Sequence, residues 1–135
     1  MITGVSVVTV LTRDQEAAHR FFTEKLGFQT RTDFRMGPQG QRWLSVVPPT
    51  GQGPEFTLFD PRSWMPPEAA EEMLQLIGKM PGLVLGTDDC RGTIADLEAR
   101  GVKIVRQPAE EPYGIEAVFA DLDGNNFVLT ELRQQ

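Results

Sequence analysis

The stretch TRDQEAAHRFFTEKLGF (residues 12–28) decides the fold, because TDDCRGTIADLEARGVK (residues 87–103) repeats its pattern. Near its start, each stretch has an aspartate that can cap a helix, and near its end it has a glycine that can stop one. Between these two signals, apolar residues recur at helical spacing, with Phe22 in the first stretch and Ile94 and Leu97 in the second. The two stretches align with a slip of one residue, so the sequence predicts a repeated unit of similar pattern.

The segments around the two helices are typical of strands, because they are rich in β-branched and aromatic residues and are bounded by turn residues. A third helix is expected from Pro66 to Gly78, with Met73, Leu76 and Ile77 on its apolar face. We therefore expect an α+β fold in which two βαβββ modules form a curved mixed sheet around a concave pocket. The predicted strands are residues 5–11, 28–35, 42–49, 54–61, 83–87, 102–106, 115–120 and 126–132.

The length of 135 residues suits one domain. We expect residues 1–61 to form the first module, 62–81 a helical linker and 82–135 the second module. The formal charge of −6 argues against nucleic acid as a partner and leaves a cationic ligand open, although solubility alone explains such a charge. A single cysteine, Cys90, permits no internal disulfide, and the apolar run near the N-terminus is too short to span a membrane. These features predict a cytoplasmic protein without a membrane partner.

Three motifs, FFTEKLGF, TDDCRGTIADLEARGV and DLDGNNFVL, together with the order of the elements, resemble the vicinal oxygen chelate (VOC) superfamily. That superfamily includes glyoxalase I, extradiol dioxygenases and bleomycin-resistance proteins. The resemblance covers nearly the whole chain, and it implies the pocketed fold described above. It also implies a homodimer whose sites lie at or near the subunit contact.

Metal-using members of this superfamily place one ligand on the first strand and one on the last strand of each module. Counting from the matched Asp and Gly landmarks puts these positions at Val7, Thr57 (give or take one residue), Gly82 and Val128. None of the four is a histidine or a carboxylate, which a catalytic divalent metal requires. The resemblance therefore predicts no metal and no cofactor, and a metal-dependent lyase or dioxygenase remains only as an alternative. The single histidine, His19, is predicted to lie on the surface of the first helix.

Alternation along the strands predicts which side chains face the pocket. If Val128 faces it, Asn126 and Thr130 do so too, whereas Glu131 points the other way and is expected to have a surface role. Such a mixture of apolar and polar groups suits a small-molecule site. The candidate ligand-binding residues are Trp43, Thr57, Phe59, Tyr113, Glu116, Asn126 and Thr130.

Glu116 is the candidate catalytic residue, and three roles for it stay open. Burial among Val118, Val128 and Trp43 would raise its pKa and suit it to act as a general base. It could instead attract a cationic ligand, or simply pair with an arginine such as Arg42.

Three other features are predicted to be structural. Trp64 is expected to anchor the linker, although it could instead cover the pocket or a subunit interface, and Cys90 is expected to be a buried, inert thiol. The turn at residues 121–124 is expected to depend on a side-chain hydrogen bond from Asp121 and on the backbone freedom of Gly124.

The function that fits these observations is a metal-free binding protein of the bleomycin-resistance type, with a small, partly aromatic ligand that can also be cationic. One alternative is a metal-independent isomerase or lyase that uses Glu116 as its base. Another is a non-catalytic interaction domain whose pocket is filled by its own side chains.

Overall fold

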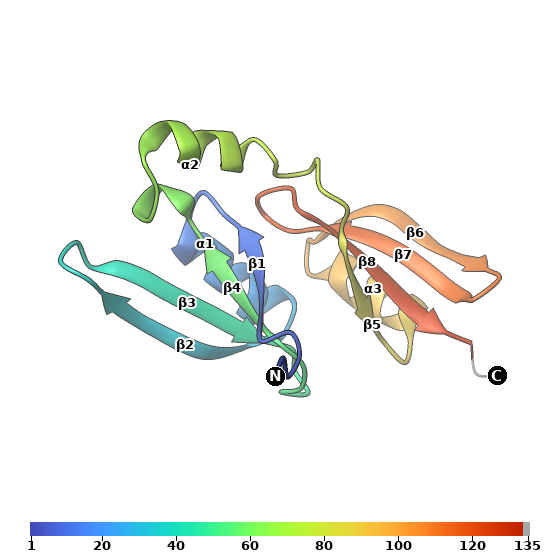
Figure 1. Cartoon of the computed structure of the whole chain (residues 1–135). Coiled ribbons are helices and arrows are strands. Elements are labelled where there is room, and N and C mark those ends of the chain that lie inside the picture. The colour runs from blue at the N-terminus through green and yellow to red at the C-terminus, as the bar shows by residue number, and fades with distance from the viewer. Residues whose placement is uncertain (134–135) are drawn as a thin grey trace. The chain divides into compact units, whose positions relative to one another are not determined.

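The computed structural model describes residues 1–133, and it contains two compact units, one from Met1 to Ile77 and one from Gly78 onward (Figure 1). Each unit holds one four-stranded mixed sheet with a helix against one side. The predicted α+β fold with two βαβββ repeats is therefore confirmed. No helix within residues 1–133 is long and apolar enough to cross a membrane.

The first unit has the strand order β1-β4-β3-β2, in which β1 and β4 run parallel and the other neighbours run antiparallel. The helix α1 packs on β3 and β4 and buries Ala18, and the turn η1 that follows it buries Phe22. The elements are β1 (Val7–Leu11), α1 (Gln15–Arg20), η1 (Phe21–Lys25), β2 (Gln29–Met36), β3 (Gln41–Val47), β4 (Glu55–Phe59), η2 (Pro61–Ser63) and α2 (Pro67–Leu74).

The second unit repeats this topology with the order β5-β8-β7-β6, and β5 runs parallel to β8. The helix α3 packs on β7 and β8 and buries Ile94 and Leu97, as the sequence predicted. The elements are β5 (Leu83–Gly86), α3 (Cys90–Ala99), β6 (Lys103–Glu111), β7 (Gly114–Ala120) and β8 (Asn126–Leu132).

The predicted helix caps are present in both units. A carboxylate oxygen of Asp14 accepts a hydrogen bond from Ala17 N at 3.0 Å, and Asp89 accepts one from Gly92 N at 2.9 Å. Gly101 follows α3 with a φ of +86°, a conformation that a residue with a Cβ rarely adopts. These local signals explain why the two helices could be placed from sequence.

Two local predictions were wrong, and the first helix, which reaches Lys25 as predicted, has an unexpected form at its end. The first helix ends in a π turn, η1, in which Leu26 N donates to Phe21 O at 3.3 Å. The helix α2 stops at Leu74 and buries Ala70 and Leu74, whereas Leu76 lies beyond it and is 42% exposed. The sixth strand continues to Glu111. It is an edge strand, and Pro108 falls within the register shift between Arg106 and Ala109, where a residue without an N–H is tolerated.

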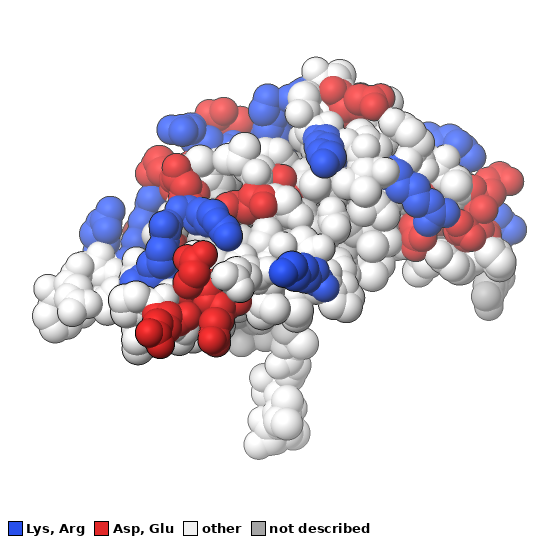
Figure 2. Space-filling view, turned by 90° about the horizontal axis from the view of Figure 1, so that it is seen from above, with Lys and Arg blue, Asp and Glu red and all other residues white. Residues whose placement is uncertain are grey.

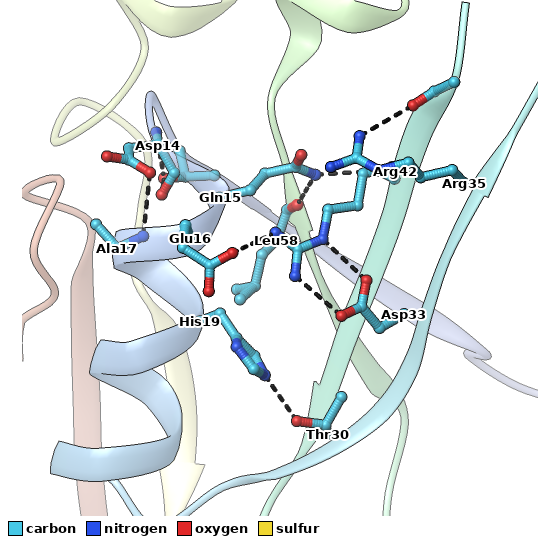
Figure 3. Close-up of polar contacts among 12 residues, drawn as sticks. Asp14, Gln15, Glu16, Ala17, His19, Thr30, Asp33, Arg35, Arg42 and Leu58 are labelled. Carbon is cyan, nitrogen blue, oxygen red and sulfur yellow. Dashed lines mark hydrogen bonds and ion pairs between the residues drawn. The ribbon is translucent and has the colours of Figure 1, made fainter.

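Polar contacts also fix α1 to β2 and β3, as Figure 3 shows. The guanidinium of Arg42 donates two hydrogen bonds to Asp33, at 2.8 and 2.9 Å, and one to Glu16 at 2.9 Å. Gln15 donates its amide to the carbonyl oxygens of Arg42 and Leu58 at 3.1 and 2.9 Å. His19 lies nearby on α1, with Nε2 2.7 Å from Thr30 Oγ1. Arg42 therefore belongs to the helix-bearing face of the first sheet.

Candidate functional site

The candidate site lies on the face of the first sheet opposite α1, and we call it the free face because α1 does not cover it, although its central residues are buried. Side chains alternate along a strand, and Arg42 points to α1, so the odd-numbered neighbours of Arg42 on β3 belong to the free face. The register pairs Ser45 with Thr57 and adds residues of β4 to the same face. The residues of β3 and β4 on this face are Gln41, Trp43, Ser45, Val47, Glu55, Thr57 and Phe59.

Three aromatic side chains meet at one end of the free face, and we call them the aromatic cluster: Trp43, Phe59 and Trp64. The ring of Trp64 stacks on Phe59 with centroids 6.2 Å apart, and it meets Trp43 edge-on at 6.3 Å. All three side chains are half-buried. The structure thus brings together two predicted ligand-binding residues, Trp43 and Phe59, and adds Trp64, for which the sequence favoured a linker anchor over a cover for the pocket.

The indole nitrogen of Trp64 is a donor without an acceptor. Nε1 is buried and has no hydrogen-bond partner within residues 1–133. Leaving a buried N–H unpaired costs about 1–3 kcal/mol, whereas most buried donors in native proteins are satisfied. Trp64 therefore carries an unmet hydrogen-bond demand within the aromatic cluster.

Hydroxyl groups occupy the middle of the free face. Thr57, a predicted ligand-binding residue, is 2% exposed, and its Oγ1 donates to Leu44 O at 3.3 Å. Ser45 is fully buried and donates to Glu55 Oε1 at 2.6 Å. Thr32 of β2 donates to the same oxygen at 3.2 Å. Glu55 is not among the candidate site residues predicted from sequence, because the two hydroxyls that hold it come from other strands.

In the second unit, Glu116, the candidate catalytic residue, lies beside the aromatic side chain of Tyr113. Tyr113 donates its hydroxyl to Glu116 Oε1 at 2.8 Å, and Arg106 donates to Glu116 Oε2 at 3.0 Å. The Glu116 side chain is 18% exposed. The hydrogen bond to Glu116 raises the pKa of Tyr113 above its usual value. An arginine pairs with Glu116, but the predicted partner was wrong: Arg42 belongs to the first unit and pairs with Asp33 and Glu16.

The remaining predicted residues of the second unit share one face with Glu116. The register pairs Glu116 with Thr130 and Ala120 with Asn126. Thr130 is 8% exposed, and its Oγ1 donates to Leu85 O at 3.4 Å, so this hydroxyl is already satisfied within the sheet. Asn126 is half-buried at the start of β8.

The four positions that the resemblance predicts as metal-ligand positions do not fit a metal in this structure. Val7 and Val128 carry no donor atom, and the Thr57 hydroxyl is turned to a backbone carbonyl. Gly82 has no room for a side chain, because a Cβ placed on it would lie 2.5 Å from Asn126 O. Within residues 1–133, no three His, Cys, Asp or Glu side chains gather as metal ligands would.

Two predictions concern residues at the start of α3: Cys90, its first residue, and Glu131 of β8, which contacts it. Cys90 is fully buried, as predicted, and burial raises the pKa of its thiol, which keeps it protonated and inert. The predicted surface role of Glu131 was wrong. Its Oε1 accepts a hydrogen bond from Cys90 N at 2.8 Å, so the carboxylate stabilises the positive end of the α3 dipole.

The turn before β8 is structural, as predicted. Asp121 Oδ1 accepts hydrogen bonds from the backbone N–H groups of Asp123, Gly124 and Asn125, at 3.0, 3.0 and 2.8 Å. Gly124 has a φ of +98°, which favours glycine. Burial raises the pKa of Asp121 to about 6, against the opposing effect of the hydrogen bonds from Asn125 and Asp123.

Charges are mixed on the surface shown in Figure 2. On that face, Lys and Arg side chains alternate with Asp and Glu and form no continuous basic area. Nucleic-acid interfaces concentrate basic side chains on one surface, so this face does not have the character of one.

Comparison with known proteins adds to this picture. Residues 4–129 match the model of the Glyoxalase/Bleomycin resistance protein/Dioxygenase superfamily. The chain is 33% identical over 132 residues to YetH of Bacillus subtilis (strain 168), described as uncharacterized, and the match covers 97% of this chain and 100% of YetH.

Two solved structures of similar size share the fold and more than a third of their residues with this chain. UcmS2 is 36% identical, with a TM-score of 0.84 and coverage of 97% of this chain and 99% of UcmS2. TnmS3, an antibiotic binding protein from Streptomyces sp. CB03234, is also 36% identical, with a TM-score of 0.77 and coverage of 98% of both chains. With the family model spanning nearly the full length, the chain belongs to the Glyoxalase/Bleomycin resistance protein/Dioxygenase superfamily.

Proposed function

We propose that this chain binds a small, partly aromatic molecule and does not transform it. The observation that carries the proposal is the aromatic cluster of Trp43, Phe59 and Trp64 on the free face, with the unpaired Trp64 Nε1 inside it. The similarity to TnmS3, an antibiotic binding protein, supports an antibiotic or a comparable aromatic metabolite as the ligand. The proposal includes a cytoplasmic homodimer that needs no metal or cofactor.

The cluster suits such a ligand for physical reasons. Stacked and edge-on aromatic contacts contribute about 0.5–1.5 kcal/mol each beyond the apolar area that they bury. A planar ligand ring packed against Trp43 and Phe59 would gain both the aromatic contact energy and the burial of apolar area. A few polar groups within apolar walls give a binding site its specificity.

Ligand screening by tryptophan fluorescence tests this proposal directly. Trp43 and Trp64 are the only two tryptophans of the sequence, and both belong to the cluster, so their emission reports on it alone. We expect planar aromatic antibiotics to quench this emission and to raise the melting temperature by mass action. Trp43→Ala should weaken binding about tenfold, and Trp43→Phe should keep most of it. Ligands that bind both variants as well as the wild type would contradict the proposal.

A second candidate function rests on Glu116, whose carboxylate is oriented by Tyr113 and Arg106. In this version the protein is a metal-independent isomerase or lyase, and Glu116 is its base. Glu116→Gln should then abolish turnover and keep most of the ligand affinity, because the amide cannot take up the proton. A protein that only binds its ligand shows no turnover to lose.

A further inference from the structure

The free face ends, opposite the aromatic cluster, in a carboxylate without a cation. Glu55 is half-buried, and its Oε1 accepts hydrogen bonds from Ser45 and Thr32. No Lys, Arg or His within residues 1–133 forms an ion pair with it. Charged groups that lose water on folding normally gain a charged partner, and the half-buried Glu55 has gained only two neutral hydroxyl donors.

A β-bulge explains why Glu55 has no cation. In the regular part of the ladder Thr30 lies opposite Val46, and the next residue, Arg31, would then lie opposite Ser45. The register shift between Thr30 and Thr32 instead places Thr32 opposite Ser45. Glu55 therefore receives a neutral hydroxyl where an unbulged strand would have brought an arginine. Bulges re-aim side chains in this way, and they are frequent next to binding sites.

The two hydroxyls also leave half of the carboxylate available. Both donate to Oε1, and no side chain within residues 1–133 donates to Oε2. A carboxylate accepts hydrogen bonds on both oxygens, so Oε2 retains its capacity for a donor. In the second unit, by contrast, both oxygens of Glu116 accept hydrogen bonds, and one of the donors is an arginine.

The spacing along β4 sets the distance between the two ends of the face. Glu55 and Phe59 are four residues apart on one strand and point to the same side, which separates them by about 13 Å. The stretch between them carries Thr57 and, on the neighbouring strand, Ser45. The free face thus presents an aromatic surface at one end and an unpaired carboxylate at the other.

We propose that Glu55 receives a cationic group, an ammonium or a guanidinium, of the aromatic ligand whose ring packs on Trp43, Phe59 and Trp64. This inference rests on the proposed function and defines its ligand class further: a planar aromatic molecule with a basic nitrogen roughly 13 Å from the ring. A hydrogen bond between a charged donor and a carboxylate is shorter and stronger than a neutral one, particularly where water is partly excluded. A single carboxylate with two hydroxyl donors supplies too few ligands for a divalent metal, which leaves an organic cation as the matching charge.

Two matched probes test the proposal. One is a naphthalene with a flexible chain that ends in a primary ammonium, and the other is the same molecule ending in a hydroxyl. Each is titrated into the full-length wild-type protein, with the fluorescence of Trp43 and Trp64 as the readout for the aromatic end. The variants are Glu55→Gln and, as a control with the same change in net charge, Glu72→Gln on the exposed side of α2.

The wild type should bind the ammonium probe about tenfold more tightly than the hydroxyl probe. Glu55→Gln should remove this preference without changing the affinity for the hydroxyl probe, and Glu72→Gln should keep the preference. Equal binding of both probes by the wild type, or a preference that survives in Glu55→Gln, would overturn the cation subsite and leave the proposed function standing. If neither probe changes the emission of the wild type, the proposed function itself fails, and the subsite fails with it. Circular dichroism shows whether Glu55→Gln remains folded, and Glu55→Asp, which keeps the charge, should then retain part of the preference.

Discussion

Asp121 is the residue whose ionisation should be visible in the stability of the protein. Burial raises its pKa from 3.8 to about 6 in the folded state, whereas an unfolded chain restores the ordinary value. Between these two values the folded state binds a proton more tightly than the unfolded state does. The contribution of Asp121 to stability is therefore fully present below about pH 4 and is lost as the pH rises through about 6, which amounts to about 3 kcal/mol.

The measurement is the free energy of unfolding by urea at several pH values, for the wild type and Asp121→Asn. The amide keeps an oxygen for the three backbone donors but does not titrate. The difference between wild type and variant should change by about 2.5 kcal/mol between pH 4 and pH 7. A carboxyl resonance of Asp121 that titrates below pH 4 would contradict this prediction.

At the scale of elements, Arg42 joins α1 to β2 and β3. Its side chain is 14% exposed, and it pairs with Asp33 through two hydrogen bonds and with Glu16 through one. We expect Arg42→Met to lower the free energy of unfolding by about 1–2 kcal/mol, since the pairing is bidentate and partly buried. Arg62→Met is the control, because the Arg62 side chain is 52% exposed and exposed pairs contribute about 0–1 kcal/mol.

The same pair has a pH dependence of opposite sign to that of Asp121. The hydrogen bonds from Arg42 lower the pKa of Asp33. This contribution is present above the ordinary carboxyl pKa and is lost as the pH falls through the lowered value. Arg42→Met should therefore cost less at low pH than at neutral pH, and an equal cost at both would show that only packing was lost.

Two glycines of the second unit form a matched pair. A Cβ on Gly82 would lie 2.5 Å from Asn126 O, whereas a Cβ on Gly86 would have nothing within 4 Å. Gly82→Ala should lower the free energy of unfolding by about 1–3 kcal/mol, because β5 must move away from β8. Gly86→Ala should be neutral or stabilising by about 0.5 kcal/mol, since alanine restricts the unfolded chain. Thermal denaturation of both variants measures this, and equal melting temperatures would contradict the clash at Gly82.

The elements show how far the sequence alone could lead. The caps Asp14 and Asp89 and the alternation in β8 are local signals, so the corresponding helices and strand were predicted correctly. The π turn at residues 21–25 was missed, because the same residues suit an α-helix. The partner of Glu116 was missed for another reason. Arg106 and Arg42 are both compatible with the sequence pattern, and only the register of β6 against β7 places Arg106 beside Glu116.

At the scale of the whole chain, the two units have equivalent positions along their strands. Comparing these positions identifies the equivalent of Glu55 in the second unit, which the sequence alone did not reveal. In the first unit, Val7 of β1 pairs with Glu55 of β4. In the second unit, the register of β5 and β8 puts Gly82 beside Asn126. Asn126 therefore occupies the position that Glu55 has in the first unit. The expected family positions for metal ligands were counted from the sequence landmarks Asp14, Asp89 and Gly124. Glu55 was not singled out, because its environment depends on a bulge in β2, which leaves no signature in the sequence.

These equivalent positions lead to a prediction about metal dependence. Val7, Gly82 and Val128 offer no donor atom, and Thr57 gives its hydroxyl to Leu44 O, so a divalent ion would have no set of three ligands here. Treatment with a chelator should therefore leave the melting temperature and the affinity for an aromatic ligand unchanged. Metal analysis of protein prepared without chelators, together with ligand titrations before and after dialysis against EDTA, measures this. A stoichiometric divalent metal whose removal weakens ligand binding would contradict the prediction, and it would favour the metal-dependent chemistry known in this superfamily.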